Sequence, residues 1–372
     1  MSKITAITMP KWGLTMTEGT VVGWLKQQGQ PFAEGEEILE IETPKITNVV
    51  EASSAGTLRR IVAKPGTTLP VGGLLAVVAA DEVPEAEIDT FIAGFAAPEP
   101  SAEAEAEDQA VRPRDVEVAG RRLRYLELGE GSGVPVLLVH GFGADLNTWM
   151  FTQPVLAATR RAVAFDLPGH GGSAKEVGTG DPEGLTDAVE GALAALAFQR
   201  VHLVGHSMGG AITTLAALRQ PERVASLTLI ASAGFGREIN ASFIDGFVRA
   251  SRRRDATEVL GLLVDNPALV SRAMVEEVLR YKRLDGVSAA LTKIAEAWFA
   301  DGRQSLDLTG RLATLKMPVQ LVWGRNDRII SVAHAEALAA RLPVHIVDAA
   351  GHLPHMEKSA EVNRMIGEFV RG

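Results

Sequence analysis

The chain has 372 residues, which is long enough for two domains of ordinary size. It contains no cysteine, and this excludes disulfide bonds, cysteine metal clusters and a cysteine nucleophile. The formal net charge is −9, but residues 81–110 alone hold ten acidic side chains and no Lys or Arg, so the rest of the chain is nearly neutral. The acidity therefore says little about partners, and no nucleic-acid partner is predicted. Because we find neither a signal peptide nor an apolar run long enough to cross a membrane, we expect a cytoplasmic protein without a membrane partner.

Residues 1–80 contain an internal repeat with an offset of 37 positions. Gly19 is matched by Gly56 and Gly29 by Gly66, and apolar residues match in between. Each copy reads as a strand, a turn at the central glycine and a second strand. Two such halves predict a small β sandwich or barrel with pseudo-twofold symmetry.

The segment between the two copies, residues 38–50, reads as a strand, a tight turn and a second strand. Pro44 suits the second position of a type I turn, because its fixed φ is already correct there. Lys45 follows at the tip of this turn. Most exposed lysines are only solvated charges, but this one occupies the turn that joins the two halves.

The stretches 9–19 (Met-Pro-Lys-Trp-Gly-Leu-Thr-Met-Thr-Glu-Gly) and 41–45 (Ile-Glu-Thr-Pro-Lys) resemble the lipoyl domains of 2-oxo-acid dehydrogenase complexes. The resemblance covers residues 1–80 and implies that Lys45 is the lysine amidated with lipoic acid. Related biotin carrier domains usually place Met on both sides of their lysine. Pro44 and Ile46 stand there instead, which favours lipoate.

Residues 81–113 are predicted to form a linker. From about residue 96 the segment consists of Ala, Glu and Pro, with no large apolar residue before Val111. Such a chain buries too little surface to offset the ordering of its backbone, and its charge keeps it extended. The short piece 88–92 is interpreted as the tail of the preceding domain rather than as a docking patch.

From residue 114 to 372, apolar runs alternate with helical stretches, which predicts a mostly parallel sheet with helices on both faces. In such sheets the chemistry lies at the carboxyl ends of the strands. A long insertion, about residues 235–310, has an amphipathic helical pattern and is predicted to form a cap. The three arginines at 252–254 are interpreted as a solvated helix face rather than as a phosphate-binding site for coenzyme A.

Residues 205–209, Gly-His-Ser-Met-Gly, lie between the predicted strand 201–204 and a helix, which is the context of a nucleophile elbow. Ser207 is therefore the predicted nucleophile, and it needs a base that a third group orients. His352 follows the last predicted strand, and Asp327 follows the strand before it. Together they predict a Ser-Asp-His triad.

Other histidines and acids are weaker candidates for the triad. Asp348 lies on the last predicted strand, and His355 falls too far into the next helix. The remaining candidates are assigned structural or surface roles: Asp166, His170, His202 and His334.

Two backbone amides are predicted to stabilise the oxyanion of the reaction. One belongs to Met208, directly after the nucleophile, and the other to Phe142 in the loop 140–143, His-Gly-Phe-Gly. These features resemble α/β-hydrolases of the His-Gly-Phe-Gly type over residues 114–372. No metal site is predicted.

Over its full length the chain resembles the dihydrolipoamide acetyltransferase component of acetoin dehydrogenase complexes. This resemblance implies that Ser207 moves an acetyl group from the S-acetyl-dihydrolipoyl arm on Lys45 to coenzyme A. It also implies two partners, a thiamine-dependent acetoin-cleaving component and a flavin dihydrolipoamide dehydrogenase. Two alternatives stay open: a serine hydrolase acting on a thioester, ester or carbon–carbon bond and recruited by its lipoyl domain, and a lipoyl carrier whose second domain is only structural.

Overall fold

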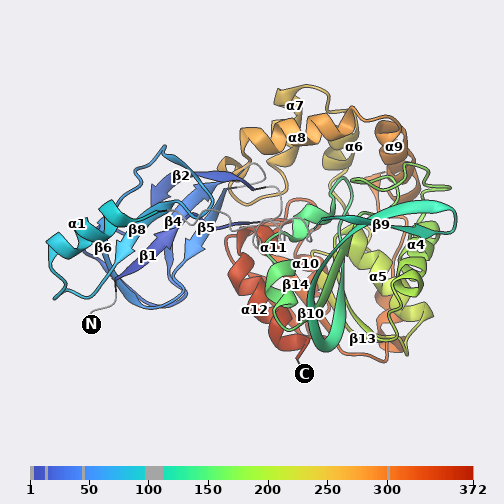
Figure 1. Ribbon diagram of the computed structural model, residues 1–372. Helices are drawn as coiled ribbons and strands as arrows, with labels where there is room; N and C mark the ends of the chain where they lie inside the picture. Colours follow the sequence, from blue (N-terminus) through green and yellow to red (C-terminus); the bar gives the residue numbers. More distant parts are fainter. Residues whose placement is uncertain (1–3, 13–15, 44–46, 97–111, 300–301, 372) are drawn as a thin grey trace. The chain divides into compact units, whose positions relative to one another are not determined.

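The computed structural model describes residues 4–12, 16–43, 47–96, 112–299 and 302–371. The chain divides into two compact units, one formed mainly by residues 1–110 and the other mainly by residues 111–372 (Figure 1). Each unit has a hydrophobic core of its own.

The first unit is built from two four-stranded antiparallel sheets. In one sheet the order is β1-β8-β6-β3, and in the other it is β5-β4-β2-β7. The apolar side chains between them, such as Val21, Ile41, Leu58 and Leu75, are buried. The strand bounds are β1 Thr5–Thr8, β2 Glu18–Trp24, β3 Pro31–Phe32, β4 Glu37–Glu42, β5 Thr47–Glu51, β6 Gly56–Ile61, β7 Thr68–Pro70 and β8 Leu74–Val78.

The two sheets confirm the repeat that the sequence predicts. Strands β2 and β4 of one sheet take the places that β6 and β8 take in the other. The matched turn glycines Gly29 and Gly66 have φ of 86° and 84°, a left-handed conformation that glycine adopts without steric strain. The predicted β sandwich of two pseudo-symmetric halves is therefore present.

A helix, α1 (Glu85–Gly94), follows strand β8 and belongs to the first unit. Its Ile88 is fully buried in a small cluster with Val77 and Val83. Glu85 forms ion pairs with Arg59 and Arg60 of strand β6, which hold the start of the helix to the sheet. The piece 88–92 thus packs as the tail of the preceding domain. The later part of the predicted linker, residues 97–111, lies outside the described residues.

The second unit contains a seven-stranded sheet in the order β11-β10-β12-β13-β14-β15, with β9 paired to β10. The second half of β10, Val136–Val139, and the strands that follow it on this path run parallel to their neighbours. Strand β9 and the first half of β10, whose Tyr125–Leu128 pair with β11, run antiparallel to their partners. Strands β12, β13 and β14 are buried along their whole length, as expected for a sheet covered on both faces. The strand bounds are β9 Arg114–Val118, β10 Arg121–Val139, β11 Arg160–Phe165, β12 Val201–His206, β13 Val224–Ile230, β14 Val319–Gly324 and β15 Val344–Val347.

The long element β10 consists of two oppositely directed halves. Leu128 and Val136 both pair with Ala162, and Tyr125 and Val139 both pair with Phe165, so the chain reverses direction in the glycine-rich piece between them. A Cβ on Gly129 would lie 2.3 Å from the carbonyl oxygen of Ala157, and one on Gly131 would lie 2.2 Å from that of Thr159. These glycines therefore allow close backbone packing where the chain reverses, as expected for a break between two strands.

Helices cover both faces of this sheet. Figure 1 shows α4 and α5 on one side of the strands and α12 on the other. Four helices, α6 to α9, lie together between β13 and β14 in the sequence, within the stretch predicted as the cap. None of the helices in the described ranges is both long and apolar enough to cross a bilayer. The helix bounds are α3 Gln153–Ala157, α4 Pro182–Ala195, α5 Met208–Arg219, α6 Ala241–Arg249, α7 Arg253–Leu260, α8 Arg272–Lys282, α9 Val287–Trp298, α10 Ala333–Glu336, α11 Pro354–Glu357 and α12 Ser359–Phe369.

Candidate active site

Ser207 lies in the sharp turn between β12 and α5. Its backbone has φ 54° and ψ −122°, a conformation that non-glycine residues rarely adopt. The flanking glycines make the turn possible: a Cβ on Gly205 would lie 2.4 Å from Thr213 Oγ1, and one on Gly209 would lie 2.4 Å from His140 O. The sequence therefore places a serine, under backbone strain, at the N-terminus of a helix, as a nucleophile elbow requires.

Asp327 and His352 come together at the carboxyl ends of β14 and β15. His352 Nδ1 lies 2.8 Å from Asp327 Oδ2, and both side chains are buried. The other carboxylate oxygen, Oδ1, accepts the backbone N–H groups of Ile329 at 2.8 Å and Ile330 at 3.0 Å. The carboxylate is thus fixed from both sides, and its bond to Nδ1 leaves Nε2 as the basic nitrogen of the imidazole.

The backbone of His352 is tied to the nucleophile elbow through His206. His206 Nε2 donates to His352 O at 2.8 Å, and the two rings are 4.8 Å apart. Within the described residues no hydrogen bond joins Ser207 Oγ to His352 Nε2; such bonds are often long before substrate binds. The structure therefore brings the three predicted triad residues to one edge of the sheet and joins two of them directly.

The predicted oxyanion loop lies against the nucleophile. A Cβ on Gly141 would lie 2.8 Å from Ser207 Cβ, so only glycine allows this approach. In the described part of the chain, the backbone N–H groups of Phe142 and Met208 donate no hydrogen bond. Two unused donors next to the serine are what a developing oxyanion needs.

The structure also shows a residue that the sequence analysis missed. Glu357, buried at the end of α11, accepts the N–H of Gly351 at 2.8 Å and that of Asp265 at 2.7 Å. Next to it, His352 N donates to Leu263 O at 2.8 Å. Burial raises the pKa of the Glu357 carboxyl to about 7. Glu357 therefore joins the histidine loop to residues 263–265 of the predicted cap. The sequence carries no signal for this role, because a Glu in a short helix is usually an exposed residue. The role becomes visible only through the contact with the distant Asp265.

The rival residues have other partners. Asp348 is exposed and forms an ion pair with Arg325. His355 is fully buried and lies 3.1 Å from Thr148 Oγ1, and burial lowers its pKa to about 3. Two other histidines also have partners away from the nucleophile: His202 contacts Ser226, and the buried His334 contacts Glu238.

The arginines at 252–254 lie at the start of α7 and are exposed. Arg253 pairs with Glu276, and Arg254 pairs with Glu258 one helical turn away. This exposure agrees with a solvated helix face, and the expectation that these arginines do not bind coenzyme A stays a prediction.

Lys45 lies outside the described residues, as do its neighbours Pro44 and Ile46. The strands on either side, β4 and β5, are described and pair antiparallel as far as Glu42 and Thr47. Among the described residues there is no group of three or more His, Asp or Glu side chains that could hold a metal ion.

The Asp327–His352 pair gives a direct prediction for Asp327→Asn. The two backbone donors at Ile329 and Ile330 will hold the amide oxygen, so the amide NH₂ will face His352 Nδ1 and favour the wrong tautomer. Hydrolysis of a small activated ester such as p-nitrophenyl acetate should fall about 10⁴-fold, with the fold unchanged by circular dichroism. Asp348→Asn serves as the matched control and should keep full activity. A loss below tenfold in Asp327→Asn would contradict the assignment.

Comparison with known proteins places both units in families. Residues 5–78 match the family model described as biotin-requiring enzyme, and residues 134–359 match the alpha/beta hydrolase fold. A crystal structure of a meta-cleavage product hydrolase superposes with a TM-score of 0.64 at 23% identity, covering 69% of this chain and 97% of that one. The predicted fold classes of both units are therefore confirmed.

Two curated relatives match the whole chain. The dihydrolipoyllysine-residue acetyltransferase component of the acetoin cleaving system from Pseudomonas putida is 48% identical, covering 100% of both chains. The protein of the same name from Cupriavidus necator is 42% identical, covering 99% of this chain and 98% of that one. Together with the two family matches, this identity over the full length confirms the predicted family. The chain belongs to the dihydrolipoyllysine-residue acetyltransferase components of acetoin cleaving systems.

Proposed function

We propose that the second unit transfers an acetyl group from a dihydrolipoyl thioester to coenzyme A through an acetyl-enzyme on Ser207. The observation that carries the proposal is the buried pair of His352 and Asp327, 2.8 Å apart, at the sheet edge that also holds the nucleophile elbow. A serine hydroxyl is a weak nucleophile at neutral pH and needs such an oriented base.

In the first step Ser207 Oγ attacks the thioester carbonyl carbon and gives its proton to His352 Nε2. The amides of Phe142 and Met208 stabilise the oxyanion of the tetrahedral intermediate. The carbon–sulfur bond then breaks, and the leaving thiolate takes the proton from His352. Asp327 keeps the imidazolium in place while it carries the positive charge.

In the second step the thiol of coenzyme A gives its proton to His352 and attacks the acetyl carbon on Ser207. When the ester bond to Ser207 breaks, the serine oxygen takes the proton back from His352. No net proton, electron or water is consumed. The same acetyl-enzyme would give acetate if water reached it, so the proposal requires that coenzyme A react faster than water.

Lys45 is proposed to carry the lipoate. A primary amine is the group that forms an amide with a carboxylic acid, and Lys45 lies in the sequence between the paired strands β4 and β5. When attached, lipoate supplies a dithiol that holds the acetyl group as a thioester. The part of the predicted linker that follows α1 would tether this carrier to the second unit, which raises its local concentration to about the mM range.

The other components are proposed from the chemistry that must precede and follow this transfer. A thiamine-dependent enzyme would cleave acetoin and load the acetyl group, and a flavin dihydrolipoamide dehydrogenase would reoxidise the dithiol. The cytoplasm is the proposed location.

A single-turnover experiment with the full chain tests the transferase against the hydrolase. The enzyme is mixed with S-acetyl-dihydrolipoamide, with and without coenzyme A, and acetyl-coenzyme A and acetate are both measured. We expect acetyl-coenzyme A as the main product, and only slow acetate release when coenzyme A is left out. Acetate release at equal rates in both mixtures would instead identify a thioesterase.

A further inference from the structure

The loop that presents the Phe142 amide is held on both sides by buried histidines. On one side, His140 Nδ1 lies 2.8 Å from Gly141 O, and His140 Nε2 lies 3.0 Å from the backbone nitrogen of Leu167. On the other side, His170 Nε2 lies 3.1 Å from the backbone nitrogen of Gly143. Phe142 is therefore the residue between two anchored glycines.

The partners of these rings determine their tautomers. A backbone N–H can only donate, so Nε2 of His140 and Nε2 of His170 must both be unprotonated acceptors. Each neutral imidazole then carries its proton on Nδ1. That proton goes to a carbonyl oxygen in both cases: Gly141 O for His140, and Pro168 O, 3.0 Å away, for His170. Protonation of Nε2 would place two N–H groups against each other and break the anchor.

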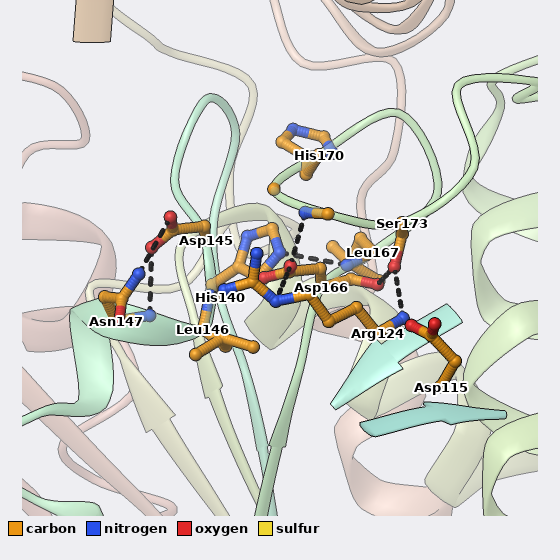
Figure 2. Close-up of polar contacts among 12 residues, drawn as sticks. Asp115, Arg124, His140, Asp145, Leu146, Asn147, Asp166, Leu167, His170 and Ser173 are labelled. Atoms are coloured by element: carbon orange, nitrogen blue, oxygen red, sulfur yellow. Dashed lines mark hydrogen bonds and ion pairs between the residues drawn. The ribbon is translucent and has the colours of Figure 1, made fainter. Parts of the chain in front are cut away.

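The surroundings keep both rings neutral. Both side chains are fully buried, and their ring centres are 5.0 Å apart, so a charge on one opposes a charge on the other. Burial lowers the pKa of His140 to about 4 and the pKa of His170 well below its usual value. The ionisable groups around them include Asp145, Asp166 and Arg124, which Figure 2 shows. Lys175 lies near His170, and the neutral His206 lies near His140.

The segment that carries His170 is itself fixed to the sheet. Asp166, at the end of β11, accepts the N–H of Leu146 through Oδ1 and the N–H of Gly172 through Oδ2, both at 2.7 Å. Figure 2 shows this carboxylate between His140 and Arg124, with His170 on the loop above it. Lys175 Nζ donates to His170 O at 3.1 Å, which closes the loop. The loop that carries His170 is thus itself fixed by hydrogen bonds, and so is the anchor that it provides for Gly143.

We propose that His140 and His170 are positioning residues that, as neutral Nδ1-protonated imidazoles, hold the Phe142 amide in place as an oxyanion donor. This inference rests on the proposed function of the Phe142 amide and goes beyond the triad, because neither ring touches the substrate. If the anchor is lost, the reaction loses a well-placed donor but keeps its nucleophile, base and binding surface.

The first test replaces the acceptor at position 170 in the full chain. His170→Phe keeps a ring of similar size but cannot accept the Gly143 N–H. We expect kcat for acetyl transfer from S-acetyl-dihydrolipoamide to coenzyme A to fall about 100-fold, as when one oxyanion donor is removed, with KM for both substrates nearly unchanged. His170→Gln offers an amide oxygen in place of Nε2 and should restore most of kcat.

A matched control separates this effect from a general loss of packing. His202 is also a buried histidine, but it contacts Ser226 on the sheet rather than the oxyanion loop. His202→Phe should keep kcat within about twofold even where it lowers the melting temperature. If His170→Phe retains wild-type kcat while Ser207→Ala abolishes transfer, this inference fails and the proposed function stands.

The second test needs no variant of uncertain folding. Long-range proton–nitrogen NMR on the full chain labelled with ¹⁵N-histidine distinguishes the two neutral tautomers of each ring. We expect His140 and His170 to be protonated on Nδ1 only, and to stay neutral down to about pH 5. An Nε2-protonated tautomer, or a titration near the ordinary histidine pKa, at either residue would overturn the proposal.

Discussion

Replacing Ser207 with alanine should lower the rate of acetyl-coenzyme A formation on the order of 10⁶-fold, because the atom that forms the acetyl-enzyme is removed. The variant keeps the elbow, the oxyanion donors and the Asp327–His352 pair, so the remaining rate reports what these groups achieve alone. Rapid-quench measurement of acetyl transfer from S-acetyl-dihydrolipoamide gives the rate. Intact mass spectrometry should detect an acetyl adduct on the wild-type chain and none on the variant.

The control for this variant is Ser305→Ala, which removes an exposed hydroxyl of the same unit and should leave the rate unchanged. Undiminished turnover by Ser207→Ala would contradict the proposal that the second unit is catalytic. The chain would then be a lipoyl carrier whose second unit serves only as a structural element.

Replacing Lys45 with arginine should abolish acetyl-coenzyme A formation from acetoin by the assembled complex. Arginine keeps the positive charge, but its guanidinium is not a substrate for amide formation with lipoate. The variant should still transfer acetyl groups from free S-acetyl-dihydrolipoamide at the wild-type rate, because the catalytic unit is untouched. The measurement pairs complex turnover with the intact mass of the chain after expression in the presence of lipoate.

Lys64→Arg is the matched control, since Lys64 is an exposed lysine of the same unit outside the predicted hairpin. It should carry the lipoyl adduct and support full turnover. An adduct that persists in Lys45→Arg but disappears in Lys64→Arg would move the attachment site and refute the assignment of Lys45.

The sequence predicted the parts of the fold that depend on local patterns. The glycine repeat at an offset of 37 predicted two matched sheets, because a left-handed turn such as the one at Gly29 is a property of a single residue. Ser207, Asp327 and His352 could be predicted because each lies in the loop or turn after the carboxyl end of a strand, and parallel strands end at one edge of the sheet.

Other features depend on contacts between residues far apart in the chain. Glu357 accepts N–H groups from Gly351 and Asp265, and the second of these lies 92 positions away. Likewise, His206 reaches the carbonyl of His352 across 146 positions. No local pattern marks such pairs, since a polar residue in a helix or strand carries no sign of which distant backbone group it will meet.

His170 illustrates the same limit in another way. The sequence assigned it a structural role in a tight loop, and its bond to Pro168 O agrees with that role. Its second bond, to the Gly143 N–H, crosses to the oxyanion loop 27 positions away. A role in positioning becomes visible only when both bonds of the ring are known.

The backbone conformation of Ser207 lowers the stability of the fold but is needed to present the nucleophile. A side chain at φ 54° and ψ −122° costs about 1–3 kcal/mol, and glycine would relieve most of that strain. Natural selection therefore has to maintain a residue that the fold alone would not favour. In a lineage that no longer uses the reaction, drift from serine to glycine at this position would make the protein more stable while ending its chemistry.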